Sequence, residues 1–182
     1  MDRECHAIIM LGHLNENGMN VCYQYWPSTD DSRNIGEFNI IFKSEIPHNG
    51  YIERTFVVSN NKNGQMQTVT QYQITEWDSN GYIENPQSII TVIEEMYKIQ
   101  RKVGTSPILI HCSDTVTRSG IFCAVVTIIE KCKTEIIVDV FQVVKTQRIN
   151  KPGSVPTPQH YQFIFELVIT YLDSFELYAN FQ

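Results

Sequence analysis

The sequence has no long apolar run and no secretory leader pattern. Its N-terminus, MDREC, has no basic region, and the apolar stretch AIIML that follows is only five residues long. A membrane-spanning helix needs about 20 consecutive apolar residues, and a signal peptide needs a longer apolar core behind a basic start. We therefore expect no membrane segment in this chain.

Cysteine is scarce and irregularly placed. The five cysteines form no CxxC pair and show no zinc-ligand spacing. An odd number of scattered cysteines argues against both a disulfide framework and a structural metal site. We expect reduced thiols and no metal or cofactor. The cysteines are Cys5, Cys22, Cys112, Cys123 and Cys132.

Blocks of like charge are also missing. The chain has 14 Lys and Arg against 20 Asp and Glu, a net charge of -6, and the acidic residues are dispersed. This pattern argues against nucleic acid or an anionic membrane as the main partner. Any phosphate-binding site must therefore be local.

Length and hydrophobic content indicate one domain over residues 1–182 with a single core, since 182 residues that are 42% hydrophobic are ample for it. The first half favours strands, because β-branched and aromatic runs alternate with turn clusters. From Pro86 onward the spacing becomes helical, interrupted by the apolar run 107–112, which predicts a strand in the middle of the sheet. The predicted strands are 6–11, 20–26, 38–42, 52–59, 68–77 and 107–112, and the predicted helices follow Pro86 and cover 119–133, 136–149 and 159–172.

The stretch HCSDTVTRSG, residues 111–120, combines a cysteine and an arginine where a predicted strand leads into a predicted helix. Backbone amides and the helix dipole at such a junction attract anions, and they lower the pKa of a thiol held there. The Arg118 guanidinium can hold two oxygens of a tetrahedral anion. A lone cysteine beside an apolar strand is more often a core residue. For Cys112, the joint presence of His111, Arg118, Ser119 and Gly120 at this spacing favours a phosphate-handling loop.

The chain resembles the protein tyrosine phosphatase family, whose signature is HCSAGxGR[ST]G. Further similar stretches occur in the same order: CHAIIML, CYQYWP, TVTQYQITEW and VDVFQVVKTQRINKPGSVPT. The likeness is greatest to the second, membrane-distal domain of receptor phosphatases. It implies an α/β (α+β) fold, with a twisted mixed sheet flanked by helices and the N-terminal part of the family domain missing.

The resemblance implies a role for several residues. Cys112 would attack phosphotyrosine, Arg118 would bind the phosphoryl group, and Ser119 would help the cysteine to leave in the second step. Glu16 would orient Arg118, although an ordinary turn residue is the alternative for it. The remaining residues of the phosphate-binding loop are His111, Ser113, Asp114, Thr115, Val116 and Thr117.

The chain departs from the family pattern at the general acid. Where the family has WPD, this sequence reads Trp77, Asp78 and Ser79, so a serine replaces the acid. Loss of a positioned general acid costs a factor of about 100 to 10,000 in rate. Asp78 would replace it only if the loop slipped by one residue, and it is more simply a solvated turn residue.

The phosphate loop and the water-positioning loop depart as well. Asp114, Thr115 and Thr117 replace an alanine and two glycines, which predicts a misshapen cradle and repulsion of phosphate. Pro156 and His160 replace two glutamines. A surface histidine is the simpler interpretation of His160, although it can in principle orient water.

These departures lead us to expect a pseudophosphatase that binds a phosphotyrosine protein or regulates an adjacent phosphatase domain. A slow phosphatase with a Cys112 cysteinyl-phosphate intermediate, and a fragment without a role of its own, are the alternatives. The resemblance implies a cytoplasmic location, as a free protein or as the intracellular part of a membrane receptor.

Overall fold

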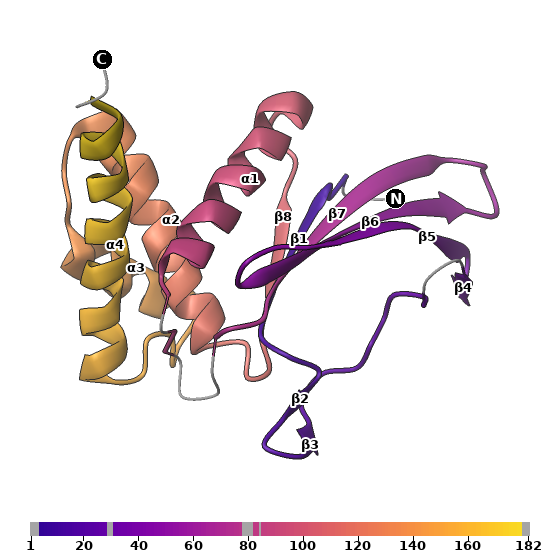
Figure 1. Cartoon of the computed structure of the whole chain (residues 1–182), viewed down its shortest axis with the longest axis horizontal. Helices are drawn as coiled ribbons and strands as arrows, with labels where there is room; N and C mark the ends of the chain where they lie inside the picture. The colour runs from indigo at the N-terminus through magenta and orange to yellow at the C-terminus, as the bar shows by residue number, and fades with distance from the viewer. Residues whose placement is uncertain (1–3, 29–30, 78–81, 84, 180–182) are drawn as a thin grey trace. The chain divides into compact units, whose positions relative to one another are not determined.

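The computed structural model describes residues 4–28, 31–77, 82–83 and 85–179. The chain divides into two units. Unit 1 consists of residues 1–75 and 94–113 and holds the β-sheet, and unit 2 consists of residues 76–93 and 114–182 and holds most of the helices (Figure 1). Helix α1, Gln87–Val103, begins in unit 2 and ends in unit 1.

Unit 1 is built on a six-stranded mixed sheet in the order β4-β5-β6-β7-β1-β8. Neighbours from β4 to β7 are antiparallel, whereas β1 is parallel to both β7 and β8. The predicted mixed sheet is therefore confirmed. The strands are β1 Ala7–Leu11, β4 Ser32–Ile35, β5 Phe38–Pro47, β6 Tyr51–Asn60, β7 Met66–Ile74 and β8 Ile108–His111, and a separate hairpin joins β2 Asn15–Glu16 to β3 Met19–Asn20.

A hydrophobic cluster of unit 1 packs on the sheet. Met10 of β1 and Phe56 of β6 pack with Trp26, and all three are at most 5% exposed. Alternate residues of a strand point to opposite faces, and β1 is buried on both, because Ile9, Met10 and Leu11 are each at most 2% exposed. The predicted strands 38–42 and 52–59 lie within β5 and β6, whereas 6–11 starts before β1, which begins at Ala7, and 68–77 extends beyond β7, which ends at Ile74.

Two strand predictions were wrong. Residues 20–26 are irregular beyond Asn20, because Trp26 enters the core from a loop rather than from a paired strand. Strand β8 was expected in the middle of the sheet, but it is the edge strand among those described, and Leu109 is 52% exposed. A four-residue apolar run fits either position, because its composition carries no information on which strands pair with it.

Three further helices follow β8 and belong to unit 2: α2 Arg118–Glu135, α3 Val140–Asn150 and α4 Pro158–Ala179. α2 packs against both α3 and α4. α3 begins later than predicted, because the Asp139 carboxylate caps its first turn by accepting a hydrogen bond from the Gln142 amide at 2.9 Å. Among the described residues, no helix is both long and apolar enough to cross a membrane.

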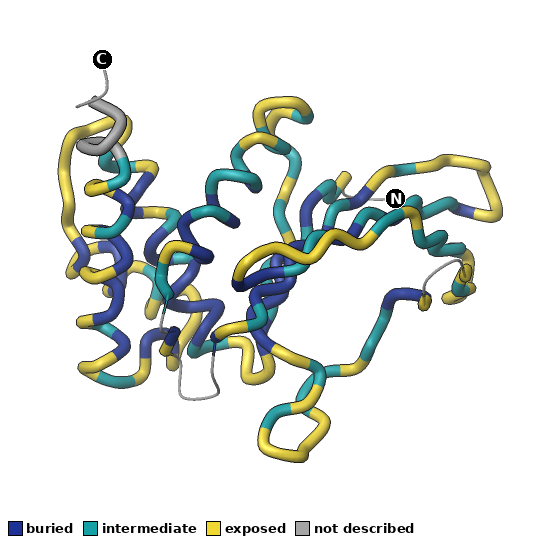
Figure 2. Tube along the Cα trace, viewed as in Figure 1, coloured by how far each residue is buried: buried dark blue, intermediate teal, exposed yellow. Residues whose placement is uncertain are grey.

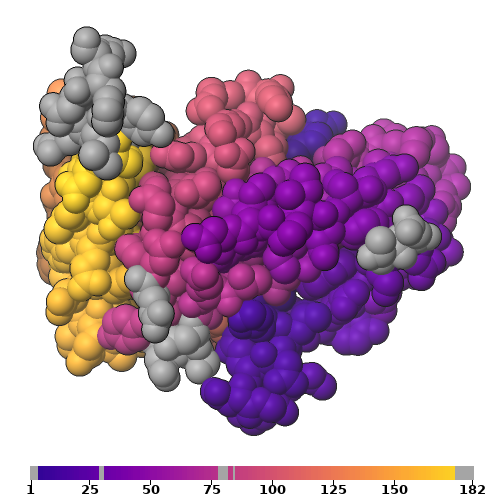
Figure 3. Space-filling model, in the orientation of Figure 1, coloured from indigo at the N-terminus to yellow at the C-terminus, as the bar shows by residue number. Residues whose placement is uncertain are grey.

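The buried face of α4 differs from the prediction. Tyr161, Phe165, Val168 and Leu172 lie on one stripe at helical spacing, which predicts a buried face, yet Phe165 and Leu172 are each 40% exposed. α4 is apolar around more than one side, so two overlapping stripes fit helical spacing, and packing selects between them. Figure 2 shows the alternation of buried and exposed positions along α4, and Figure 3 shows part of its exposed surface. The buried residues are Phe163, Ile164, Leu167, Val168 and Tyr171.

Gly120 lets the first turn of α2 approach the segment after α3. A Cβ atom at this position would lie 3.2 Å from the Ser154 Cβ, 3.2 Å from the Val155 amide nitrogen and 3.3 Å from the Gln147 Nε2. The Gln147 side chain also donates a hydrogen bond to the Gly120 carbonyl at 2.8 Å. Gly120 is therefore needed for close packing rather than for backbone freedom.

We expect Gly120→Ala to lower the free energy of unfolding by about 1–2 kcal/mol. Overpacking costs about 1–3 kcal/mol, and the better helix propensity of alanine returns at most about 1 kcal/mol. Urea-induced unfolding measures the difference. Thr127→Ala, on the exposed face of the same helix, is the control and should leave stability unchanged or slightly raised. A gain in stability for Gly120→Ala would contradict the packing argument.

Candidate functional site

The predicted phosphate loop follows the expected order of strand, loop and helix. β8 ends at His111 and α2 begins at Arg118, so residues 112–117 form the connection. The boundary between the two units falls inside this connection, after Ser113. Cys112 thus belongs to unit 1, whereas Asp114 and Arg118 belong to unit 2.

On the unit 1 side, Cys112 is buried, with 8% of its surface exposed. The five cysteines are all free thiols, as predicted. His111, the last residue of β8, has its Nε2 atom 3.0 Å from the Tyr25 hydroxyl, and the two rings meet edge to face at 5.6 Å. Burial lowers the pKa of His111 below its usual value, because the imidazolium form is desolvated. The imidazole next to Cys112 is therefore neutral near pH 7.

Tyr25 was missed as a site residue by the sequence reasoning. It lies in the stretch CYQYWP, which served only to support the family resemblance. Burial raises the pKa of its hydroxyl to about 12, so Tyr25 remains a hydrogen-bond donor at any physiological pH. The only sequence signal was a second tyrosine in a short apolar segment, and this does not identify its partner.

Glu16 lies in the small β2–β3 hairpin of unit 1. Asn17 and Gly18 both have positive φ, at 52° and 78°, as a two-residue type I′ turn requires. The Glu16 Oε1 atom accepts a hydrogen bond from the His13 amide at 3.4 Å. The proposed pairing of Glu16 with Arg118 would join the two units, and it stays a prediction.

On the unit 2 side, the Asp114 carboxylate accepts hydrogen bonds from backbone amides of its own loop. Its Oδ1 atom accepts hydrogen bonds from the amides of Val116 and Thr117, each at 3.0 Å. Its Oδ2 atom accepts a short hydrogen bond from the Thr117 hydroxyl. These amides precede and open helix α2, where donors are oriented toward negative charge. The amides at the start of α2 therefore bind the protein's own Asp114 carboxylate.

Thr115 keeps a backbone conformation that suits glycine. Its φ is +63°, in the left-handed region, where an L-residue costs about 1–2 kcal/mol. The family signature has glycine at this position. Thr115 is thus held in a strained, glycine-like turn. The two amides that follow this turn donate hydrogen bonds to Asp114.

Arg118 is buried, with 2% of its surface exposed, and its Nη1 atom donates to the Trp77 carbonyl at 3.2 Å. Trp77 is fully buried, and its ring packs edge to face with Phe163 at 6.2 Å. Ser119, next in α2, is 8% exposed. In unit 2 the arginine is therefore fixed against the residue at which the family's acid loop begins. Asp78 and Ser79, on which the loss of the acid depends, lie outside the described residues.

His160 is not a surface histidine, so that expectation was wrong. Only 6% of its surface is exposed, and its ring lies 5.7 Å from the Tyr82 ring. Its amide donates to the Thr157 hydroxyl at 3.1 Å in the first turn of α4, which turns the residue inward. A role of His160 in orienting water stays a prediction.

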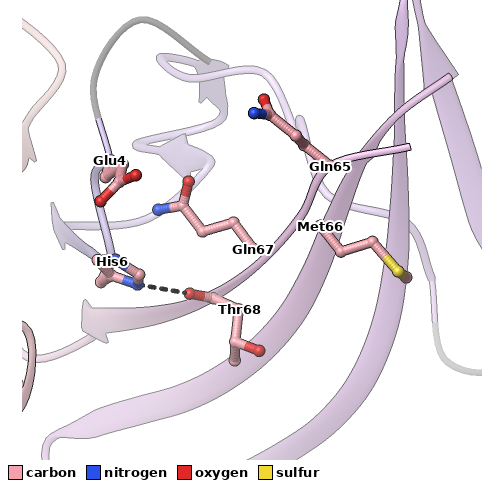
Figure 4. A pocket seen from close by; sticks show the side chains of 6 residues that line it. All are labelled: Glu4, His6, Gln65, Met66, Gln67 and Thr68. Atoms are coloured by element: carbon pink, nitrogen blue, oxygen red, sulfur yellow. Dashed lines mark hydrogen bonds between the residues drawn. The ribbon is translucent and has the colours of Figure 1, made fainter. Parts of the chain in front are cut away.

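A separate polar hollow of about 440 Å³ lies in unit 1 (Figure 4). In it, the His6 Nδ1 atom lies 3.2 Å from the Thr68 carbonyl oxygen. Of the predicted site residues that the structure describes, none contributes to this hollow. Its lining residues are Glu4, His6, Gln65, Met66, Gln67 and Thr68.

Comparison with known proteins identifies the family. The family model described as protein-tyrosine phosphatase matches residues 1–170. The chain therefore belongs to the protein-tyrosine phosphatase family, as the resemblance of its motifs indicated, and its mixed sheet and helices agree with that assignment.

Several curated relatives are receptor-type phosphatases. Human receptor-type tyrosine-protein phosphatase alpha is 36% identical over 176 residues, which cover 97% of this chain and 22% of the relative. The chain is 35% identical over 174 residues to receptor-type tyrosine-protein phosphatase S of Gallus gallus, a match that covers 95% of this chain and 11% of the relative. A similar match to receptor-type tyrosine-protein phosphatase F of Bos taurus covers 9% of that protein. The chain thus spans less than a quarter of the length of these relatives.

Proposed function

We propose that this chain is a catalytically silent phosphatase-like domain that acts through protein contacts. It either regulates an adjacent phosphatase domain or holds a phosphorylated partner. The proposal rests on one observation: the Asp114 carboxylate accepts hydrogen bonds from the Val116 and Thr117 amides, each at 3.0 Å. Phosphotyrosine would have to displace this carboxylate before it could use the same donors.

Electrostatics adds to this competition. A carboxylate about 6 Å from a dianionic phosphate costs on the order of 5 kcal/mol at an effective dielectric constant near 20. Asp114 is exposed, so solvent reduces this cost substantially. The Asp114 carboxylate still competes with phosphate for these amides, because two acceptors cannot lie on the same N–H direction.

Other substitutions support the proposal at different steps of the reaction. Ser79 stands where the family has its acid, and Pro156 and His160 stand where it has two glutamines. Such losses compound when they affect separate steps. Cys112, Arg118 and Ser119 are retained, and for this reason a slow phosphatase is kept as the alternative.

The test is hydrolysis of p-nitrophenyl phosphate, an activated ester that needs little help from a general acid. Wild-type protein and Cys112→Ser are purified identically and compared at equal concentration. We expect equal rates at the background level, because the wild-type loop does not bind the phosphoryl group productively. Matching far-UV circular dichroism spectra establish that both proteins are folded.

Turnover by the wild type that Cys112→Ser abolishes would overturn the proposal and establish the slow phosphatase. Turnover that survives in Cys112→Ser comes from a contaminating enzyme, and removing it by further purification should return both proteins to background. Ser79→Asp combined with Asp78→Pro then tests the acid: no gain in rate is expected while Asp114 still occupies the loop amides.

A further inference from the structure

A chain of buried and partly buried hydrogen bonds in unit 1 ends at His111. The Arg54 Nη1 atom of β6 donates to the Gln71 Oε1 atom of β7 at 3.0 Å. The Gln71 Nε2 atom donates to the Tyr25 hydroxyl at 2.6 Å, and this hydroxyl lies 3.0 Å from the His111 Nε2 atom. Four residues that are far apart in the sequence are thereby joined in one line.

The direction of every bond in this line is set at Arg54. A guanidinium can only donate hydrogen bonds, so the Gln71 oxygen must face it and the Gln71 amide group must face Tyr25. The Tyr25 oxygen accepts from Gln71, which leaves its own proton for His111. The His111 Nε2 atom must then accept, and a neutral imidazole that accepts at Nε2 carries its proton on Nδ1.

We propose that Arg54, acting through Gln71 and Tyr25, is a positioning residue that holds His111 in the neutral tautomer with its proton on Nδ1. The residue beside Cys112 therefore supplies no positive charge to a thiolate. This inference deepens the proposed function at the same loop, but it rests on the hydrogen-bond line and not on the absence of catalysis.

Arg54 can determine the direction of these hydrogen bonds because several other contacts hold its guanidinium in place. It is 6% exposed, its Nε atom lies 2.5 Å from the Glu45 Oε2 atom, and its guanidinium carbon lies 4.7 Å from the centre of the Trp26 ring. Its Nη1 atom also donates to the Gln73 Oε1 atom at 2.7 Å. With these contacts in place, the guanidinium cannot rotate away from Gln71 without losing several of them.

The surroundings of His111 agree with a neutral ring. Burial lowers its pKa, as described above. Tyr25 is the titratable group bonded to it, and Cys112 follows it in the chain. Its register partner on β1, Met10, carries no charge.

The tautomer is measured directly by nitrogen-15 NMR of the imidazole rings in the full chain, since a protonated and an unprotonated ring nitrogen have very different chemical shifts. The chain has five histidines, and the His111 signals are assigned by their loss in His111→Asn. In the wild type we expect an excess of the Nδ1-protonated form of up to about tenfold, the preference that one hydrogen bond confers.

Gln71→Glu should invert the tautomer. A carboxylate still accepts from Arg54 but cannot donate to Tyr25, so the tyrosine proton turns to Glu and the tyrosine oxygen faces His111. Nε2 must then donate, and we expect the Nε2-protonated form to dominate and the pKa of His111 to rise by about one unit, a tenfold change. Tyr25→Phe removes the donor to Nε2, so the excess of the Nδ1-protonated form should be lost and the pKa of His111 should rise. Tyr72→Phe, a buried tyrosine next to Gln71, is the control and should change neither.

A wild-type ring protonated mainly on Nε2 would overturn the inference, and so would an unchanged tautomer in folded Gln71→Glu. If that variant does not fold, the wild-type tautomer and the Tyr25→Phe titration still decide. Phosphatase activity lost in Cys112→Ser, together with an Nδ1-protonated His111, would refute the proposed function and leave this inference intact.

Discussion

Asp114→Ala combined with Thr115→Gly and Thr117→Gly should bind tungstate about 10 to 100 times more tightly than the wild type. The triple change frees the Val116 and Thr117 amides, which now donate to Asp114 at 3.0 Å, and it removes a negative charge from the loop. A net gain equal to one charge-assisted hydrogen bond, about 1.5–3 kcal/mol, gives this range, because about 1.4 kcal/mol corresponds to a factor of ten. Titration calorimetry measures the affinity.

Asp114→Asn is the matched control, because its amide oxygen still accepts from the loop amides while the charge is gone. We expect it to bind tungstate less tightly than Asp114→Ala. If Asp114→Ala, alone or in the triple variant, did not improve binding, the carboxylate would not be the obstacle. In that case the lost affinity would have to arise elsewhere in the loop.

Arg54→Met should lower the free energy of unfolding by about 3–5 kcal/mol. The substitution leaves the Gln71 and Gln73 acceptors without their donor, at about 1–3 kcal/mol each, and removes the contact with the Trp26 ring. Urea-induced unfolding followed by far-UV circular dichroism gives the change.

Arg33→Met is the control for Arg54→Met, because Arg33 also lies over an aromatic ring, that of Tyr23, but in a more exposed position. We expect this variant to lose less than about 1 kcal/mol. Equal losses in the two variants would show that the buried acceptors contribute nothing beyond a surface contact.

Local patterns in the sequence predicted most of the elements. Periodicity is a property of short segments, so it could be recognised without knowledge of the fold. Examples are the partly alternating apolar residues of β5, β6 and β7 and the helical spacing of Ile89, Ile90, Ile93 and Met96. The position of β8 at the edge and the buried face of α4 depend on which elements meet. Sequence periodicity does not contain that information.

The candidate site shows the same division. The spacing from Cys112 to Arg118 predicted a loop between a strand and a helix, and the chemistry of Asp114 predicted repulsion of phosphate. That Asp114 would occupy the amides itself depends on the local backbone, including the left-handed φ of Thr115. The line from Arg54 to His111 joins residues 57 positions apart in the chain, so only tertiary structure reveals it.

The backbone links Asp114 to Val116 and Thr117, whose amides donate hydrogen bonds to its carboxylate. The carboxylate is therefore a tethered ligand of these amides. A tethered ligand competes at an effective concentration far above that of any phosphomonoester in solution. Raising the substrate concentration therefore does little to dislodge it. A partner that gains access to this loop must either bring binding energy from contacts elsewhere on its surface or pull the aspartate aside.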